Sequence, residues 1–536
     1  MLLQHISSKE YERDQELRPS ASGNDEQHLH SLAYSSRYAT TEIPKYELPD
    51  KSCEPSTAYQ LVHDELDLDG LPAMNLASFV HTWMEPEAEK LVMENISKNL
   101  ADVDEYPATV RIQGRCVSIL GNLWHAKKAV GTPTVGSSEA VMLGGLAMKK
   151  MWQAKRKAQG KGIHHPNIVF GNNAQVALEK FARYFDVEAR MIPVSEDSQH
   201  CLDIHKAIEA CDENTIGMFV IMGSTYTGHF EDVKGMSKLL DDLQERTGID
   251  IPIHVDGASG GFIAPFAFPE LEWDFRLPRV VSINTSGHKF GLSYAGIGWV
   301  LWRSEEVLPK ELVFELHYLG GTEFTFNLNF SRPACFMISQ YYNFIRLGKE
   351  GYTRIVENDL VNARLFSKAL EGSTYFDVLS DMHRPEGTFG WRHPPAKQKK
   401  SAKGVKYNPA LPVVVFKLTD AFQRQYPHVK QAAISTLLRT KGWIVPNYPL
   451  PCNEENIEIL RVVVRESLTR DMLDRLIDDI MDCTNKLKCL ETQLDVGVFA
   501  PLEHYGEAPR TSKRVSRSID DKKHKIKKAK TYARTC

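Results

Sequence analysis

The chain has 536 residues, of which 42% are hydrophobic, 25% charged and 9% aromatic. This balance is typical of a soluble globular protein and excludes collagenous, wholly disordered and membrane-embedded chains. The net charge of -4 gives no reason to expect a nucleic acid or an anionic membrane as a partner.

The beginning of the chain is polar. Residues 1–55 are rich in Ser, Glu, His and Arg with little periodicity, which predicts a mobile leader, and we expect an N-terminal docking segment over residues 56–73. No apolar run of signal-peptide length stands near the start. The nine cysteines contain no C-x-x-C pair, so a disulfide framework and a metal site are not indicated. A cytoplasmic location fits these features best.

Apolar runs alternate with helical periodicity from residue 74 onward. Strands are expected at residues 167–170, 216–222, 251–255, 280–283 and 297–302, with helices at 141–158 and 176–185. The alternation predicts an α/β fold in which helices wrap a mostly parallel sheet. We assign residues 74–345 to this large domain.

The pattern changes after residue 345. A helix at 349–370 and strands at 412–418 and 457–464 predict a smaller C-terminal α/β domain over residues 346–498. From Glu507 to the end, eleven Lys or Arg residues stand against three acidic residues. We therefore expect residues 499–536 to form a basic, disordered tail.

Two motifs in the large domain predict a carbonyl-binding cofactor. Lys289, in TSGHKFG, lies between two apolar strands; it is either an ordinary surface lysine or an amine that attacks a carbonyl to form a Schiff base. Asp256, in HVDGASGG, either caps a turn or binds a ligand. Together they suit pyridoxal phosphate, because the carboxylate can keep the ring nitrogen protonated while the lysine holds the aldehyde.

A third motif, GSSEA, precedes the helix predicted at 141–158. Ser137 and Ser138 at this helix start are suited both to capping the helix and to binding a phosphate with the free N–H groups. Both roles can hold at once.

These motifs, with NFSRPA at 329–334, resemble the pyridoxal-phosphate-dependent group II amino acid decarboxylases, in the branch of the bacterial, plant and fungal glutamate decarboxylases. The similarity runs from about residue 58 to about residue 490. It implies the aspartate-aminotransferase-like fold type I of pyridoxal phosphate enzymes. It also implies conversion of L-glutamate to 4-aminobutanoate and carbon dioxide.

The resemblance also implies roles for individual residues. Lys289 would hold the cofactor aldehyde and Asp256 the ring nitrogen. The other cofactor contacts would be Ser137, Ser138, Gln175, Thr225, Ala258 and His288, with Phe330 and Ser331 contributed by a neighbouring subunit. Arg461 would bind the α-carboxylate of the substrate. The region that receives the distal carboxylate would contain Ser78, Phe79, Asn99 and Asp102.

For assembly, the resemblance implies at least a homodimer, or a hexamer. Plant members carry a basic tail that binds calmodulin, but the tail here has no tryptophan anchor, so we expect a disordered tail instead of a calmodulin switch. The chain departs from the usual family pattern at Gly257, at residues 171–175 and at 322–324. Two alternatives stay open: a pyridoxal enzyme acting on a different substrate, and a catalytically silent paralogue, although the latter would be expected to lack Lys289 or Asp256.

Overall fold

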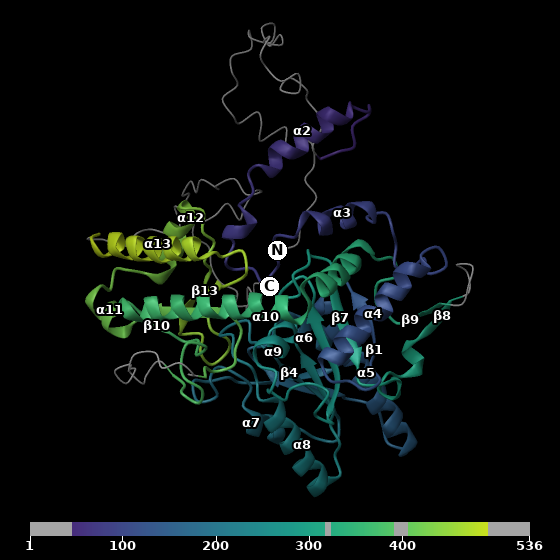
Figure 1. Ribbon diagram of the computed structural model, residues 1–536. Coiled ribbons are helices and arrows are strands. Elements are labelled where there is room, and N and C mark those ends of the chain that lie inside the picture. The colour runs from purple at the N-terminus through teal and green to yellow at the C-terminus, as the bar shows by residue number, and fades with distance from the viewer. Residues whose placement is uncertain (1–45, 317–322, 391–405, 491–536) are drawn as a thin grey trace, which may run out of the picture. The chain divides into compact units, whose positions relative to one another are not determined.

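The computed structural model describes residues 46–316, 323–390 and 406–490, and it divides the chain into two compact units, residues 1–71 and 72–536 (Figure 1). In the described part of the first unit, α2 (Pro55–Leu66) begins with a proline at its first helical position, where the missing N–H costs nothing. Most of the expected leader and all of the expected basic tail lie outside the described residues. The expected domain boundaries remain predictions.

A seven-stranded sheet forms the centre of the second unit, with the strand order β1-β7-β6-β5-β4-β2-β3. Its strands are β1 (Val130–Thr134), β2 (Asn167–Gly171), β3 (Glu188–Ile192), β4 (Thr215–Ile221), β5 (Ile253–Asp256), β6 (Val280–Ser286) and β7 (Gly298–Trp302). All pairs from β3 to β6 are parallel, and β7 is antiparallel to both β6 and β1. The mostly parallel sheet predicted from the sequence is therefore confirmed.

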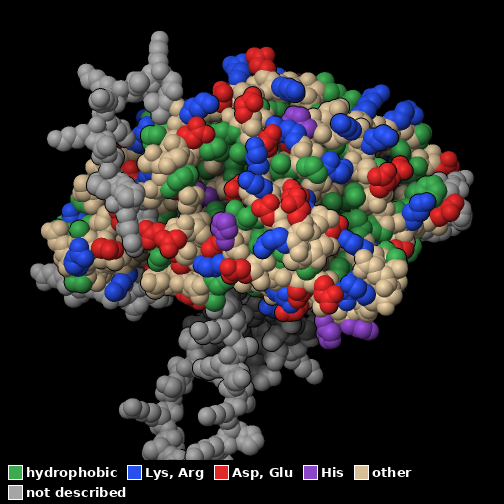
Figure 2. Space-filling model, turned by 90° about the horizontal axis from the view of Figure 1, so that it is seen from below, with side chains coloured by type: hydrophobic (Ala, Val, Ile, Leu, Met, Phe, Trp, Pro, Cys, Tyr) green, Lys and Arg blue, Asp and Glu red, His purple; other side chains and the backbone are tan. Residues whose placement is uncertain are grey.

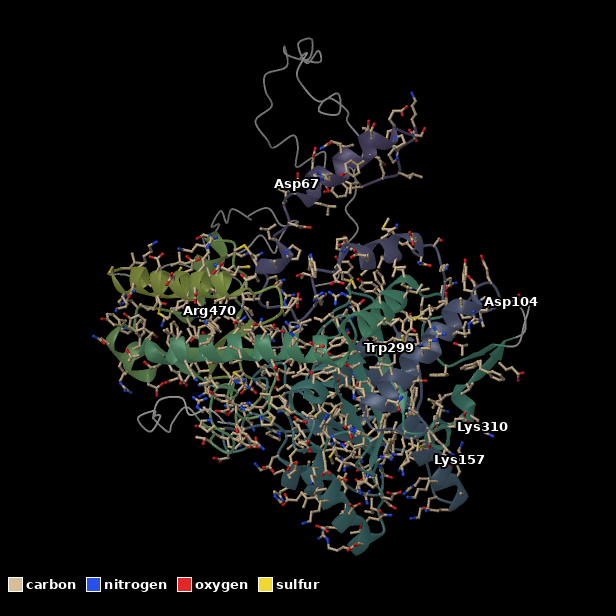
Figure 3. The ribbon with its side chains drawn as sticks, in the orientation of Figure 1. Asp67, Asp104, Lys157, Trp299, Lys310 and Arg470 are labelled. Carbon is tan, nitrogen blue, oxygen red and sulfur yellow. The ribbon has the colours of Figure 1, made fainter. Side chains whose placement is uncertain are left out.

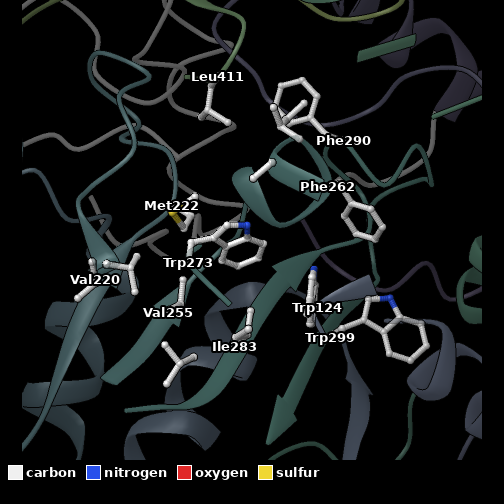
Figure 4. Packing of buried hydrophobic residues seen from close by; sticks show 14 of the residues in the cluster. Trp124, Val220, Met222, Val255, Phe262, Trp273, Ile283, Phe290, Trp299 and Leu411 are labelled. Carbon is white, nitrogen blue, oxygen red and sulfur yellow. The ribbon is translucent and has the colours of Figure 1, made fainter. Parts of the chain in front are cut away.

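Helices cover this sheet and bury it on both faces. They are α4 (Pro107–Leu123), α5 (Ser137–Ala158), α6 (Val176–Tyr184), α7 (Ile204–Glu209) and α8 (Val233–Thr247). Along β4, Phe219 packs with α5 and α6, whereas its neighbours Met218 and Val220 join the core on the other face. Strands buried on both faces read as continuous apolar runs, which is why these strands were visible in the sequence. Figure 4 shows part of the larger core, where Val220, Val255 and Ile283 come from adjacent strands.

The second unit also contains several short elements. They are α3 (Pro86–Glu94), α9 (Ala264–Ala267), the strand pair β8 (Phe314–Leu316) and β9 (Glu323–Thr325), and 3-10 turns at Pro72–Met74, Gly260–Phe262, Glu305–Val307 and Lys310–Leu312. In Figure 3, Trp299 of β7 lies inside the molecule, whereas Lys157 and Lys310 lie at its periphery.

A second, antiparallel sheet of four strands follows in the order β10-β11-β13-β12. Its elements are β10 (Phe376–Val378), β11 (Val413–Leu418), α11 (Asp420–Gln425), α12 (Gln431–Thr440), β12 (Asn447–Pro449), β13 (Glu458–Val463) and α13 (Arg470–Lys488). The long helix α10 (Cys335–Gly372) leads into it and runs alongside α13 in Figure 1. Gly348 adopts φ 56° and kinks α10 close to the expected domain boundary.

The helices and one face of the surface can be described for the part of the chain that the structure covers. No helix there combines the length and the apolar composition that crossing a bilayer requires. On the face shown in Figure 2, Lys and Arg side chains are interspersed with Asp and Glu.

Candidate active site

Three strand ends meet at the carboxyl edge of the parallel sheet. Ile221 of β4 is the register partner of Asp256 in β5, and Asp256 is the partner of Asn284 in β6. Ligands of open α/β sheets bind beyond this edge, because loops leave the strands there. The register therefore places the Asp256 carboxylate at the expected binding edge.

A chain of buried side chains fixes Asp256. Its Oδ1 accepts hydrogen bonds from Asn284 Nδ2 at 2.9 Å and from the Ala258 backbone N–H at 3.1 Å. Asn284 Oδ1 in turn lies 2.7 Å from His254 Nε2, and His254 Nδ1 lies 2.7 Å from Ser282 Oγ. Burial lowers the pKa of His254 to about 4, so its imidazole is neutral at neutral pH. Within the described ranges both hydrogen bonds that the Asp256 carboxylate accepts use Oδ1, which leaves Oδ2 for a ligand.

Lys289 stands in the turn that follows β6, as the sequence predicted. Its Nζ lies 5.2 Å from the centre of the Phe79 ring. The guanidinium carbon of Arg461 lies 5.1 Å from the same ring centre. Phe79 thus brings together an amine from the large sheet and a guanidinium from β13, although the three residues are far apart in the sequence.

Arg461 is buried and held by backbone carbonyls. It donates to the oxygen of Thr225 at 2.7 Å and to that of Ala77 at 2.6 Å. The ring centre of Tyr448 lies 5.5 Å from the guanidinium carbon of Arg461. The Nε of Arg461 has no hydrogen-bond partner among the described residues. A guanidinium fixed in this apolar surrounding is an effective carboxylate receptor, because the charge is weakly screened there.

The start of α5 packs against the end of β6 and the segment that follows it. Ser137 Oγ lies 2.6 Å from Ser286 Oγ. A Cβ added at Gly136 would stand 3.2 Å from the His288 ring, so the turn and the imidazole are packed closely. Burial, reinforced by the charge of Lys289, lowers the pKa of His288 to about 4. Ser138, also predicted at this turn, is exposed.

A cavity of about 290 Å³ adjoins Arg461. Residues from both sheets line it, among them Asn172, Gln175, Thr225, Tyr226, Tyr448 and Arg461. Gln175 also caps α6, since its Oε1 accepts from the Ala177 N–H at 2.6 Å. Lys289 and Asp256 are not part of this lining, so the cavity corresponds to the side of the site near Gln175 and Arg461.

The remaining predicted residues form a second cluster. Asn99 Nδ2 donates to Ser331 Oγ at 3.3 Å, and its Oδ1 accepts from the Arg332 N–H at 3.0 Å. Asp102 follows in the same segment and is half-buried, and Phe330 is exposed. Asn99 therefore contacts Ser331 and not Arg461. Half-buried Ser78, in contrast, directly precedes Phe79, which lies between Lys289 and Arg461.

Gly257 is required by close packing. A Cβ at this position would stand 2.9 Å from the backbone oxygen of Asn284. The Gly257 N–H donates to that same oxygen at 3.0 Å. The glycine, which the sequence showed only as a departure from the family pattern, thus lets β5 and β6 approach just beyond Asp256.

Several residues of the site were missed by the sequence analysis. They are His254, Ser282, Asn284, Ser286, Tyr226 and Tyr448. His254 and Ser286 belong to the quoted motifs, and their polar side chains at strand ends were the available signal. The two tyrosines carried no such signal. Tyr448 reaches Arg461 because β12 pairs with β13, and the Tyr226 ring lies 5.9 Å from the Tyr448 ring only in the folded chain.

Comparisons with known proteins identify the family to which the chain belongs. Residues 44–391 match the family model described as the pyridoxal-dependent decarboxylase conserved domain. The chain is 47% identical over 476 residues to "Glutamate decarboxylase 5" of Arabidopsis thaliana, covering 88% of this chain and 90% of the relative. It is 48% identical over 473 residues to the glutamate decarboxylase of Saccharomyces cerevisiae, with 83% and 79% covered.

A solved structure of glutamate decarboxylase from Lactobacillus brevis is similar as well. Its sequence is 40% identical, its TM-score is 0.77, and the match covers 85% of this chain and 98% of that one. The fold type I architecture predicted from the sequence is thereby confirmed. The chain belongs to the pyridoxal-dependent decarboxylase family.

Proposed function

We propose that this protein decarboxylates L-glutamate to 4-aminobutanoate and carbon dioxide with pyridoxal phosphate as its cofactor. The observation that carries the proposal is the Phe79 ring, which lies about equally far from the Lys289 amine and the Arg461 guanidinium. A group held by the amine can therefore present a carboxylate to the guanidinium. Relatives that share 44–48% of their residues with this chain are glutamate decarboxylases.

The residues present fit pyridoxal phosphate. Asp256 offers a buried carboxylate oxygen for a protonated ring nitrogen, and half-buried Ala258 follows it. The start of α5, with Ser137 and Ser286, offers N–H and hydroxyl groups to a phosphate. His288 Nδ1 is buried without a partner in the described part of the chain, so it can serve a phosphate oxygen as well.

The cofactor, when bound, supplies a conjugated ring that accepts the electron pair left when the carboxylate departs. The chain positions the reacting groups. Asp256, held by Asn284, keeps a proton on the ring nitrogen, which increases the capacity of the ring to accept those electrons. Lys289 would hold the aldehyde of the cofactor, and its amine would be the group that delivers a proton to the α-carbon.

Arg461 orients the bond that breaks. Its guanidinium is fixed by the oxygens of Thr225 and Ala77, so a carboxylate that binds it has a defined direction. Phe79 and Tyr448 flank the charge, and only 1% of the Arg461 surface is exposed. These contacts support an assignment of Arg461 to the α-carboxylate, which remains a proposal at the level of the individual residue.

A homodimer would complete the site. Asn99 and Ser331 form a polar cluster of their own, and large apolar side chains are exposed nearby in the chain, at Phe324, Leu328 and Phe330. We infer that this surface meets a second copy and that the cluster serves the partner's site at the distal carboxylate. Light scattering would distinguish a dimer or hexamer from a monomer. A cytoplasmic location is likewise our proposal.

Turnover across a panel of amino acids tests the proposed function. The purified protein is loaded with pyridoxal phosphate and supplied in turn with glutamate, aspartate, diaminobutyrate and aromatic amino acids, and carbon dioxide release is recorded. Glutamate should be turned over fastest. Faster turnover of an aromatic amino acid, or release from none of them, would refute the proposal.

A further inference from the structure

Glu231 is a buried carboxylate behind the cofactor-binding edge. It lies in the segment between β4 and α8, and only 4% of its surface is exposed. It accepts hydrogen bonds from the Ile221 N–H at 2.7 Å, Asn173 Nδ2 at 2.8 Å and the Leu202 N–H at 3.2 Å. No Lys or Arg forms an ion pair with it in the described ranges, so three neutral donors alone hold this charge.

The first of these bonds closes the loop that carries Thr225. Residues 222–230 leave the end of β4 and return to it, with Met222 and Phe230 bridged. At the base of the loop, the Glu231 N–H donates to the Ile221 oxygen at 3.1 Å, while the Glu231 side chain accepts from the Ile221 N–H. Backbone and side chain of one residue therefore fix both ends of the loop.

The second bond reaches the loop that carries Gln175. Asn173 is buried and stands two residues before Gln175. Its amide donates to the same Glu231 oxygen that receives the Leu202 N–H. Gln175 and Thr225 both line the cavity next to Arg461. The Glu231 carboxylate thus connects the two loops that carry Gln175 and Thr225, and both of these residues line the cavity.

We propose that Glu231 is a positioning residue that holds the Gln175 loop and the Thr225 loop at a fixed separation and so shapes the seat of the cofactor. The inference rests on the proposed function for the identity of the cofactor. It concerns cofactor binding and not the choice of amino acid, so the two can fail separately.

The charge state of Glu231 gives the proposal a second readout. Burial is the main cause that raises the pKa of Glu231 to about 7, and the charge of Asp256 adds to it. Cys201 stands directly before Leu202 and is also buried near Glu231, and burial raises its pKa well above the usual value. Protonation of Glu231 weakens it as an acceptor. The two loops should therefore be held most tightly, and the cofactor bound most tightly, above pH 7.

Asp212 provides a matched control. It joins the same two strands at their opposite ends, because its Oδ1 accepts from Asn167 at the start of β2 and from Thr215 at the start of β4. Asp212→Asn removes a carboxylate between these strands without touching the carboxyl edge. A merely structural effect on β2 and β4 would appear in both variants.

The test measures cofactor dissociation from the Glu231→Gln and Asp212→Asn proteins by titrating the apoprotein with pyridoxal phosphate and recording its visible absorbance. Glu231→Gln should weaken binding on the order of tenfold, since one buried N–H loses its acceptor. Asp212→Asn should bind as the parent does. Equal affinities of Glu231→Gln and the parent would overturn the proposal, and so would equal weakening in both variants.

If Glu231→Gln folds poorly, the Asn173→Ala variant and the pH dependence of cofactor affinity in the parent test the same role. Asn173→Ala cuts only the connection to the Gln175 loop and should weaken cofactor binding in the same direction; unchanged binding would overturn the proposal. In the parent, affinity should rise as the pH increases through about 7. A rise of the same size in Glu231→Gln would also contradict it. If the parent binds the cofactor but leaves glutamate unchanged, the proposed function fails and this inference does not.

Discussion

Lys289 is the residue on which the chemistry depends most. It follows β6 in a turn between two buried strands, and its amine lies over Phe79. We predict that Lys289→Ala abolishes covalent attachment of the cofactor and lowers decarboxylation by several orders of magnitude, because the nucleophilic amine is lost. Absorbance after gel filtration and carbon dioxide release measure the two effects. Parental turnover in this variant would show that the assignment is wrong.

Asn284 supports the carboxylate that faces the ring nitrogen. Its side chain bridges Asp256 and His254, and both of these are buried. We predict that Asn284→Ala lowers cofactor affinity about tenfold, since a buried carboxylate and a buried imidazole each lose a partner at a cost of about 1–3 kcal/mol. Equilibrium dialysis measures this affinity. Parental affinity would show that Asp256 does not need this support.

At the scale of elements, two segments far apart in the sequence meet around Asn99. The segment before α4 and the segment before α10 are joined by the Asn99–Ser331 and Asn99–Arg332 bonds. We predict that Asn99→Ala raises the KM for glutamate on the order of tenfold and changes kcat less, because the distal carboxylate contributes to binding and not to bond breaking. Initial rates over a range of glutamate concentrations measure both constants. A loss confined to kcat would contradict this role.

The elements also show how far the sequence could predict the site. Lys289, Asp256 and Ser137 were predictable because each follows a buried strand or begins a helix within a short motif. The five strands predicted in the large domain are present, with ends displaced by up to three residues. β1 was missed because VGTPT is short and contains Gly and Pro, and β3 because its burial is partial.

Contacts between distant strands and loops were beyond the sequence analysis. Asn284 contacts Asp256 across 28 residues, and Glu231 contacts Asn173 across 58. The register of neighbouring strands determines the first pair, and the path of the loop after β4 determines the second. Neither feature has a local sequence pattern. The helix expected from residue 349 in fact begins at Cys335, because α10 continues through the kink at Gly348.

At the scale of the whole molecule, the role of the basic tail is a question for experiment. It lies outside the described residues. We predict that removing the residues from Glu507 onward leaves glutamate turnover nearly unchanged, because the tail lacks a tryptophan anchor for a helix-binding partner. Rates of the full-length and shortened proteins, each with and without calcium-calmodulin, measure this. Calcium-dependent activation of the full-length protein alone would instead identify the tail as an autoinhibitory switch.

The central claim is that the whole site acts on the α-carboxylate of glutamate. Glutamate labelled at the α-carboxyl carbon and glutamate labelled at the side-chain carboxyl carbon are given separately to the holoenzyme, and the label is followed in carbon dioxide and in 4-aminobutanoate. The account predicts that all released label comes from the α-carboxyl carbon and that the side-chain label stays in 4-aminobutanoate. Carbon dioxide carrying the side-chain label, or no labelled carbon dioxide from either substrate, would contradict it.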